Sequence, residues 1–486
     1  MNSNVIKWLN EKLGCNISAE YYNYIDEWLD WWRGYRQQFH NTLHNNGKNL
    51  VKRDLYNLKM GKKVCEDWAS ILLNSKTHIK ISDEKTNDFV QGKRETEGVL
   101  GGNCFWTKGN GLVEDAFATG TGAVTLSVSR VRIKNGRLER SPDAKIVLTY
   151  LSADYIVPLT VIKDSITEAA FVSEMVIMGK KHIAIEMHRL NNLGNYEISN
   201  YLFLAENNQF EQQPLPGGMA ETFDTGSPLP WFSIVMPNIK NNIKDTNGLG
   251  ISVLHNAIDA LKAVDLCFNN FCSDFYLGQK KVFMEKGLIE YTEDGREIAP
   301  DDVHQQLFSF IQFPKSSLSD SQKFIYEFNP ALRVEDNTKG VQAALDYLSF
   351  KCGLGNKHYQ FNGGTVVTAT QYTGDKQDLI QNADKHYAYV EQFLLSLVRS
   401  IIYIGKNIIG ADIKEDSEVE IDFDRSIIID DTAERLQDQQ EVRDGLQAKW
   451  EFRVKYHGET KEEAKAMIAE IDGEQDIDLG FDEEGG

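Results

Sequence analysis

The sequence contains few cysteines, and none has the spacing of a metal site. Six occur in 486 residues: Cys15, Cys65, Cys104, Cys267, Cys272 and Cys352. There is no Cys-x-x-Cys pair, so the common zinc and redox motifs are excluded. Cys267 and Cys272 lie five positions apart but lack the further ligands that a metal ion needs. We expect free thiols in a reducing compartment, no metal site and no cofactor.

Long apolar runs are also missing. The most apolar stretch, "FLLSLVRSIIYI" at 393–404, has 12 residues and contains Arg399. A membrane-spanning helix needs about 20. The first residues, "MNSNVIKWLNEKLG", have neither the basic nor the apolar region of a secretory signal. We therefore expect a soluble protein without a membrane partner.

Basic residues are too scarce for a protein that binds nucleic acid tightly. The chain has 52 Lys and Arg against 72 Asp and Glu, a net charge of −20. Residues 411–486 hold 25 of the acids and 9 of the bases, so the first 410 residues are nearly neutral. A tight DNA-binding surface would be strongly basic. Any DNA partner must be held loosely, and the acidic end, 472–486, is expected to be frayed.

Catalytic motifs are absent as well. No Gly-Lys pair is followed by Ser or Thr, and there is no HExxH, GxSxG or GxGxxG. "GTGA" at 120–123 favours a tight strand entry over a dinucleotide loop, and Glu186 and His188 favour a structural pair on one strand face. We predict that the chain is not an enzyme. An enzyme of nucleic acid would need an acidic metal cluster or a phosphate loop.

Helical and extended patterns alternate along the first half of the chain. Residues 20–39 place Tyr24, Trp28, Trp31 and Tyr35 on one helix face, which favours core packing over a face kept for a partner. A second amphipathic helix is predicted over 54–73, followed by the strand-like "THIKI". From 124 to 235, alternating segments separated by turn residues predict a mostly antiparallel β region.

The second half is dominated by long helices. A helix is predicted over 252–277, about 39 Å long, with Ser252 as N-cap, Gly278 as stop and Asp265 as a polar intrusion on its apolar stripe. Short strands and turns follow over 279–333. A helix over 336–354 and one over 375–404 enclose the loop "NKHYQFNGGTVVTATQYTG". A strand ("VEIDFDRSIII") and two helices complete the chain, the second with a capping box of Thr460 and Glu463.

Several stretches, in this order, resemble the portal proteins of tailed phages that infect Gram-positive bacteria. They are "LKMGKKVCEDWASILLN" (58–74), "EDAFATGTGAV" (114–124), "NGLGISVLHNAIDALKAVD" (247–265), "TVVTATQY" (365–372) and "GETKEEAKAMIAEI" (458–471). They span nearly the whole chain. Gln371 departs from the pattern, because the family usually has an acid after Thr-Ala-Thr; this puts in doubt a local charge role for that position.

The resemblance implies an α+β portal fold with named parts. These are a wing (1–247), stem helix 1 (248–278), a β-rich clip (279–335), stem helix 2 (336–354), a tunnel loop (355–374), a long wing helix with a return strand (375–430), and a helical crown with an acidic tail (431–486). It also implies a homo-oligomeric ring, typically a dodecamer of about twelve copies, at one capsid vertex.

The implied function is a channel for packaging and ejection of double-stranded DNA, with no catalysis. The implied partners are further copies of the chain, the DNA, the terminase large subunit, a head–tail adaptor, and the major capsid and scaffolding proteins. The location would be the virion, with assembly in the host cytoplasm. The alternatives are a subunit of a nucleic-acid-processing enzyme, or another virion structural protein such as a capsid or scaffold component.

The resemblance also implies two sets of site residues. The tunnel loop would place these residues in the channel: Asn356, Lys357, His358, Gln360, Asn362, Gly363, Gly364 and Thr365. Its glycines give freedom, and its polar side chains offer weak contacts; the alternative is a surface loop between two packed helices. The exposed clip tip would place these residues against a partner: Glu293, Asp294, Arg296, Asp301 and Asp302.

Overall fold

The computed structural model describes most of the chain. The described residues are 3–45, 50–93, 96–134, 136–139, 141, 143–206, 210–217, 219–285, 293–294, 308–311, 325–361, 369–423, 431–457 and 461–478. The chain divides into two compact units. Unit 1 comprises Met1–Thr365 with Gln381–Phe423, and unit 2 comprises Val366–Ile380 with Asp424–Gly486.

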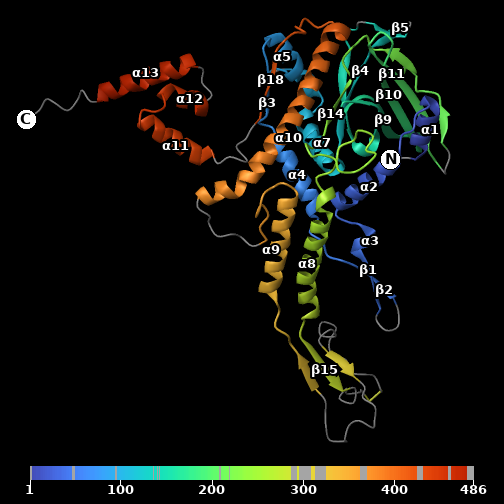
Figure 1. The fold of residues 1–486 in the computed structure, drawn as a ribbon, viewed down its shortest axis with the longest axis vertical. Coiled ribbons are helices and arrows are strands. Elements are labelled where there is room, and N and C mark those ends of the chain that lie inside the picture. Colours follow the sequence, from blue (N-terminus) through green and yellow to red (C-terminus); the bar gives the residue numbers. More distant parts are fainter. Residues whose placement is uncertain are drawn as a thin grey trace, which may run out of the picture. The chain divides into compact units, whose positions relative to one another are not determined.

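Both helices and strands are abundant, which confirms the α+β class (Figure 1). The α-helices are α1 (Ser3–Leu13), α2 (Glu20–Arg33), α3 (Gln37–His40), α4 (Met60–Leu72), α5 (Glu84–Gln91), α6 (Gly98–Gly102), α7 (Phe105–Thr119), α8 (Ile258–Leu277), α9 (Val334–Lys351), α10 (Ala369–Ile404), α11 (Asp431–Arg443), α12 (Lys449–His457) and α13 (Lys461–Asp478). Short 3₁₀ turns lie at Ala153–Tyr155 and His255–Ala257, and a π turn at Gly405–Ile409.

Within the described residues, the strands form five separate sheets. They are β1 (Asn41–Asn45), β2 (Leu50–Asp54), β3 (His78–Ile81), β4 (Gly122–Ser129), β5 (Arg132–Lys134), β6 (Arg137–Glu139), β7 (Lys145–Ser152), β8 (Ile156–Ile162), β9 (Ser165–Ile177), β10 (Lys180–Leu190), β11 (Tyr196–Leu204), β12 (Glu211–Gln213), β13 (Thr222–Asp224), β14 (Phe232–Val235), β15 (Lys281–Glu285), β16 (Phe308–Ile311), β17 (Ile325–Phe328) and β18 (Val419–Asp422).

The predicted β region folds into two of these sheets. The larger has the order β5-β6-β13-β11-β10-β9-β8, with β12 beside β11, and the smaller has the order β14-β4-β7. All pairs are antiparallel except β13 with β6, as the alternating sequence predicted. Sequence reasoning did not locate β8 and β9. The main apolar core lies against these sheets and includes Phe171, Ile185 and, from α2, Ile25 and Trp28.

The predicted aromatic helix, α2, packs in the core with only part of its aromatic face. Trp28 and Trp31 are buried, which confirms core packing, but Tyr24 is 39% exposed and Tyr35 41% exposed. The Trp28 indole Nε1 donates to His255 Nδ1 at 3.1 Å. The helix stops at Arg33 and not at 39, because Gly34 takes a left-handed conformation there.

The predicted first stem helix starts later than its periodicity indicated. Residues 251–254 are not helical, because Val253 N and Ser252 Oγ both donate to the Phe117 carbonyl oxygen, at 3.1 and 3.0 Å. Ser252 therefore does not cap the helix. The helix α8 has 20 residues, about 30 Å in length, and not the predicted 39 Å. It packs along α9, which runs from Val334 to Lys351 and not from 336 to 354.

A β-hairpin that the sequence analysis did not predict lies beside α8. It consists of β1 and β2, which cover 41–45 and 50–54. The sequence pattern predicted no element between 40 and 53, and a helix that would begin at 54. The buried pair of His40 and Asp265, whose Nε2 and Oδ2 lie 3.1 Å apart, links its base to α8. Leu58 N donates to Asp265 Oδ1 at 3.0 Å. Asp265, the polar residue that interrupts the apolar stripe of α8, thus binds the segment around His40 and Leu58 to this helix.

The far end of the α8–α9 pair holds a small three-stranded sheet. Its order is β16-β15-β17, with β15 and β16 parallel and β15 and β17 antiparallel. All three strands lie within 279–333, the segment for which short strands and turns were predicted. Where the chain returns, the Asp274 carboxylate accepts from the Arg333 backbone N at 2.8 Å and from its guanidinium Nη2 at 2.8 Å. This contact joins the last turn of α8 to the start of α9.

The long helix α10 begins at Ala369, six residues before the predicted 375. Elongating an existing helix costs much less than starting one, so the helix continues through the Thr- and Gly-containing segment. By length and composition Gln377–Ile409 could cross a membrane, yet 56% of its most apolar window is buried within the protein, as in a core helix of a soluble protein. Leu394, Val398 and Ile401 are among its buried residues.

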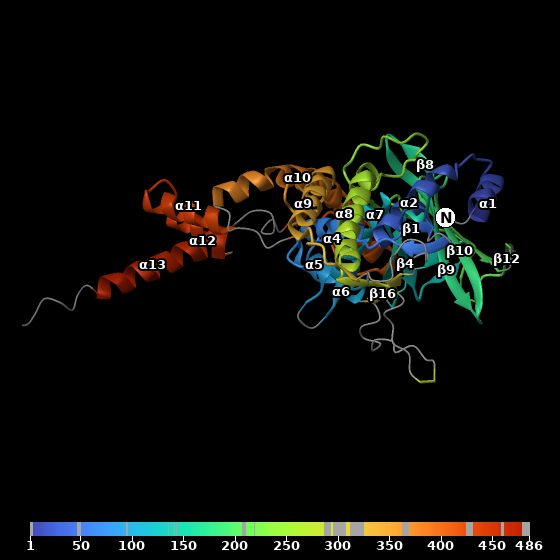
Figure 2. The same ribbon diagram turned by 90° about the horizontal axis from the view of Figure 1, so that it is seen from below.

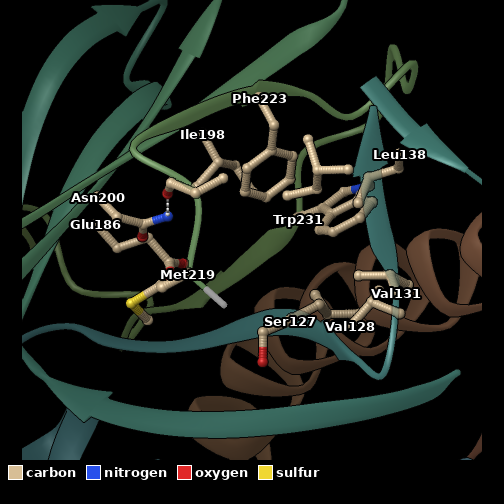
Figure 3. Close-up of a pocket in the computed structure, with 13 residues that line it drawn as sticks. Ser127, Val128, Val131, Leu138, Glu186, Ile198, Asn200, Met219, Phe223 and Trp231 are labelled. Atoms are coloured by element: carbon tan, nitrogen blue, oxygen red, sulfur yellow. Dashed lines mark hydrogen bonds between the residues drawn. The ribbon is translucent and has the colours of Figure 1, made fainter. Parts of the chain in front are cut away.

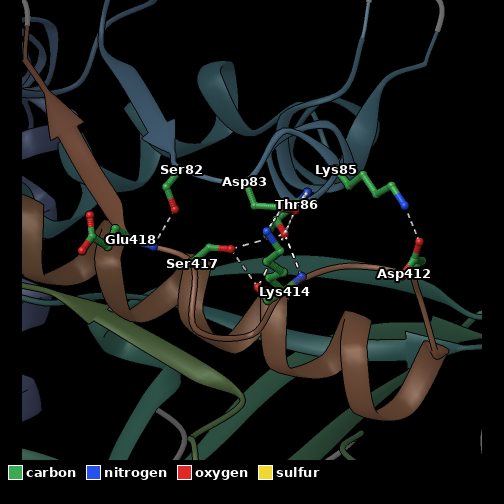
Figure 4. Close-up of polar contacts among 8 residues, drawn as sticks. All are labelled: Ser82, Asp83, Lys85, Thr86, Asp412, Lys414, Ser417 and Glu418. Carbon is green, nitrogen blue, oxygen red and sulfur yellow. Dashed lines mark hydrogen bonds and ion pairs between the residues drawn. The ribbon is translucent and has the colours of Figure 1, made fainter.

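After α10 the chain is fastened to the segment around α5 (Figure 4). Lys414 Nζ lies 2.9 Å from Asp83 Oδ1, Lys414 N donates to Thr86 Oγ1 at 3.0 Å, and Lys85 pairs with Asp412. These contacts lead into the β18–β3 pair, in which Ile421 lies opposite Ile79. The predicted "THIKI" strand is confirmed as β3.

Unit 2 contains three described helices after α10, where two were predicted. Asp438, at a buried position of α11, accepts from Lys455 Nζ at 2.6 Å and from the Tyr456 hydroxyl at 2.8 Å, both on α12. The helix α13 continues to Asp478, which corrects the prediction that the chain frays from 472. The predicted capping residue Thr460 lies outside the described residues.

Candidate functional site

The segment that leaves α9 makes a tight turn where it enters the predicted tunnel loop. Gly353, Gly355 and Lys357 have positive φ angles of 78°, 80° and 60°. A Cβ atom at Gly353 would lie 3.3 Å from Asn382 Nδ2, which itself donates to the Gly353 carbonyl oxygen at 3.0 Å. Glycine at 353 thus permits both the left-handed turn and the close contact with α10.

A carboxylate on α4 anchors the next residues. The Tyr359 hydroxyl donates to Asp67 Oδ2 at 2.8 Å, and His358 Nε2 lies 3.6 Å from the same oxygen. Lys63, one turn earlier on α4, also pairs with Asp67. Burial alone would raise the pKa of Asp67, but hydrogen bonds from His358, Lys63 and Tyr359 outweigh it and lower that pKa. Burial, and secondarily the Asp67 charge, raises the pKa of Tyr359, so its proton stays in the bond.

A side-chain amide on α9 holds the backbone of the same segment. Gln342 Nε2 donates to the Tyr359 carbonyl oxygen, and Gln342 Oε1 accepts from Phe361 N, both at 2.8 Å. The Phe361 ring centroid lies 5.4 Å from that of Phe271 and 6.4 Å from that of Phe268, on α8. Residues 352–361 are therefore fixed to four helices: α4, α8, α9 and α10.

The structure places half of the predicted tunnel-loop residues. Asn356, Lys357 and Gln360 are exposed, and His358 is half-buried on Asp67. The others, Asn362, Gly363, Gly364 and Thr365, lie outside the described residues. The predicted loop, 355–374, is also shorter than expected at its far end, since α10 already begins at Ala369. Sequence reasoning missed Asp67, Gln342 and Tyr359, and only the polar residue Asp67 on an amphipathic helix could have indicated the anchor.

The predicted clip contacts are described less completely. Glu293 and Asp294 form an exposed turn between β15 and β16. Arg296, Asp301 and Asp302 lie outside the described residues.

The helix pair α8–α9 carries no excess of positive charge. Helix α8 has three acidic residues and one lysine, and α9 has three acidic residues and two lysines. Lys262 pairs with Asp259 at 2.9 Å, and Lys339 pairs with Glu335 at 2.7 Å. A DNA duplex next to these helices would meet few free cations.

The described residues contain no cluster of three or more His, Cys, Asp or Glu side chains that could hold a metal ion. The six thiols are free. Burial raises the pKa of the Cys352 thiol to about 12 and that of Cys65 well above its usual value. Both thiols are thus protonated, and neither is a ready nucleophile. Cys267 and Cys272 are half-buried.

A cavity of about 400 Å³ opens in the β region of unit 1 (Figure 3). Its walls are mainly apolar, with Ile198, Phe223 and Trp231 among them. Glu186 lies at its edge, and its Oε1 is 2.6 Å from His188 Nε2, so the predicted strand pair does form. His188 is fully buried, and this geometry makes the pair part of the packing. The "GTGA" segment is likewise structural: Gly120 ends α7 at φ 86°, and Gly122 begins β4.

Comparison with known proteins supplies the identity of the fold. None of the curated protein sequences compared with the chain matches it. A family model described as phage portal protein, SPP1 Gp6-like, matches residues 15–476 of the 486. Portal proteins are structural, non-enzymatic virion proteins that act in genome packaging and form homo-oligomeric rings in phage capsids. The chain therefore belongs to the SPP1 Gp6-like family of phage portal proteins.

Proposed function

We propose that the chain is the ring subunit of a DNA channel, and that the segment after Phe361 forms the constriction of that channel. The observation that carries this proposal is the anchoring of residues 352–361. Asp67, Gln342 and the phenylalanines of α8 fix the chain up to Phe361. The next residues include Gly363 and Gly364, the pair with the greatest backbone freedom in the segment. A fixed base followed by a glycine pair suits a loop that moves with its substrate.

The charge pattern supports passage of DNA over capture of DNA. Each phosphate that a protein neutralises adds affinity through counterion release. The α8–α9 pair is slightly acidic, and on the fixed segment Lys357 is accompanied by the neutral Asn356 and Gln360. Such a surface makes weak, exchangeable contacts, so DNA can slide past it.

The other parts of the chain take the roles that the family resemblance implies. Residues 1–247 and 375–430 serve as the wing. The sheet β15–β17 serves as the clip, where the terminase large subunit and later a head–tail adaptor would dock. The helices α11–α13 serve as the crown inside the capsid. A dodecamer at one vertex, in contact with capsid and scaffolding proteins, completes the proposal.

The first test of the proposal is the assembly state. Native mass spectrometry with negative-stain images of the same sample should give rings of about a dozen copies with a central hole. A monomer or dimer at every concentration and salt would contradict it, and an assay for metal-dependent nuclease activity would then test the enzyme alternative.

The second test addresses the loop itself. A variant with Gly363→Pro and Gly364→Pro should assemble rings but package DNA poorly in an assay with cognate procapsids and terminase, because proline removes backbone freedom. The matched double alanine variant should retain more activity. Loss of rings in the proline variant would place the loop at a subunit interface, and normal packaging would exclude a mobile constriction.

A further inference from the structure

The β1–β2 hairpin exposes two leucine side chains to solvent on one of its faces, among polar neighbours. Antiparallel pairing sets Leu43 opposite Lys52, and Asn45 opposite Leu50. Because side chains alternate along a strand, Leu43, Leu50 and Lys52 share one face. Leu43 is 61% exposed and Leu50 68% exposed. Large aliphatic side chains this exposed at the edge of a fold are candidates for contact with a partner.

The opposite face of the hairpin is held against α8. The Arg53 guanidinium lies 5.4 Å from the centroid of the Tyr276 ring on α8. On the leucine face, at the hairpin base, Asp54 Oδ1 accepts from the Tyr35 hydroxyl and from Asn41 Nδ2, each at 3.0 Å, which ties the hairpin to the residues after α2. The Arg53–Tyr276 contact and the buried His40–Asp265 pair join the hairpin to α8. The exposed leucines are thus presented on a rigid support.

The helix α9 exposes a second set of apolar side chains. Its buried residues Val341, Leu345 and Leu348 follow helical spacing and form one stripe. At about 100° per residue, Tyr347 and Phe350 fall on the opposite side, and they are 55% and 54% exposed. Two exposed aromatic rings therefore stand on the side of α9 that faces away from its buried stripe.

These two faces lie at opposite ends of one row of elements. Figures 1 and 2 both show the order α9, α8, hairpin, with α8 in the middle. Contacts join each neighbouring pair in this row, α9 to α8 and α8 to the hairpin. A closed ring needs a head-to-tail interface, in which one surface of each copy meets a different surface of the next. The row supplies two such surfaces, one at each end.

We propose that Leu43 and Leu50 of one copy dock against Tyr347 and Phe350 of the neighbouring copy. Each face is therefore occupied by another copy of this chain. This inference rests on the proposed ring. The hairpin acts as an arm, and the α9 face receives it. Burying two leucines against two aromatic rings removes all four side chains from water, and the repeat of this contact around the ring fixes the stem helices side by side.

Site-directed cross-linking tests this contact. In a Cys104→Ser background, Leu50→Cys and Phe350→Cys are combined and treated with a short bismaleimide. The expected result is a ladder of covalent oligomers up to the full ring on a denaturing gel, with no ladder beyond the background level from either single variant. Rings without a ladder would overturn the inference and leave the proposed function standing. Wild-type protein that forms no ring would overturn both.

A charge variant provides an independent test. Leu43→Asp with Leu50→Asp should raise the concentration needed for ring assembly at least about tenfold, which corresponds to the loss of about 1.4 kcal/mol per contact. The matched control is Leu193→Asp, a leucine that is also highly exposed but lies in the turn after β10. Equal assembly of the two variants, with equal melting temperatures, would contradict the inference.

Discussion

The Tyr359 hydroxyl donates a hydrogen bond of 2.8 Å to Asp67 Oδ2, across 292 positions of the sequence. This bond joins the helix α4 to the segment that leads into the proposed constriction. Both partners are largely buried, so the bond cannot be replaced by water without cost.

Tyr359→Phe should loosen this anchor. A buried hydrogen bond to a charged group contributes about 1.5–3 kcal/mol. We expect a loss of this size in the free energy of unfolding and faster amide exchange at residues 353–361, with rings still forming. Tyr35→Phe is the control, because Tyr35 makes the same phenol–carboxylate bond at an exposed position. Equal effects of the two variants would contradict the anchoring role.

Acidification below pH 6.5 should destabilise the core of unit 1 through His386. Burial lowers the pKa of His386 to about 3 from 6.5, and its Nδ1 accepts from Asn238 N at 2.9 Å. Above pH 6.5 the histidine is neutral in both the folded and the unfolded state, so the free energy of unfolding is at its full value. As the pH falls from 6.5 toward 3, the free energy of unfolding decreases by about 1.4 kcal/mol per pH unit, because only the unfolded state takes up the proton.

His386→Gln retains a hydrogen-bond acceptor for Asn238 N but does not titrate. Thermal unfolding from pH 7 to pH 4 should therefore fall less steeply for this variant than for the wild type. His182→Gln, at a side chain nearer the surface, is the matched control. A wild-type slope in His386→Gln would show that another group governs the acid response.

Asp115→Asn should stabilise the protein at neutral pH. Burial, with the nearby charges of Glu114 and Asp154, raises the pKa of Asp115 to about 6 from 3.8. An acid with a raised folded-state pKa costs stability as the pH rises from about 4 to 6, and the cost stays constant above that. The gain at pH 7.5 should reach at most about 3 kcal/mol and vanish near pH 3.5. Denaturant unfolding at both pH values, with the exposed Asp143→Asn as control, measures it; a gain that does not depend on pH would refute the assignment.

Alanine at Gly120 or Gly250 should abolish soluble expression. A Cβ at either glycine would lie 2.2 Å from the carbonyl oxygen of the other, and Gly120 also has a φ of 86°. Both neighbours are backbone atoms, which cannot move aside as a flexible side chain would. Gly111→Ala, on α7 with nothing within 4 Å, should instead gain about 0.4–1 kcal/mol. A folded Gly250→Ala protein with an unchanged melting temperature would disprove the close approach.

Local patterns in the sequence determined the class of most elements. Alternation located β4, β7, β10 and β11, and helical spacing located α2, α4, α8, α9 and α10. Such patterns succeed because burial of one face depends on residues a few positions apart. The missing Cys-x-x-Cys spacing likewise predicted free thiols, and the structure confirms them.

Tertiary contacts decided what periodicity could not. Apolar spacing continues through 251–258, yet the close approach of Gly120 and Gly250 and the bonds of Ser252 and Val253 to Phe117 O keep 251–254 out of the helix. The polar Asp265 interrupted an apolar stripe for no reason visible in the sequence, because its partner His40 lies 225 positions away. The anchor of the proposed constriction, Asp67 with Tyr359, is of the same kind. The sequence by itself determined the helical and strand periodicities of this protein. Only the tertiary structure decided which polar groups, distant in sequence, share a buried site, because a polar group that is buried without a partner costs too much free energy.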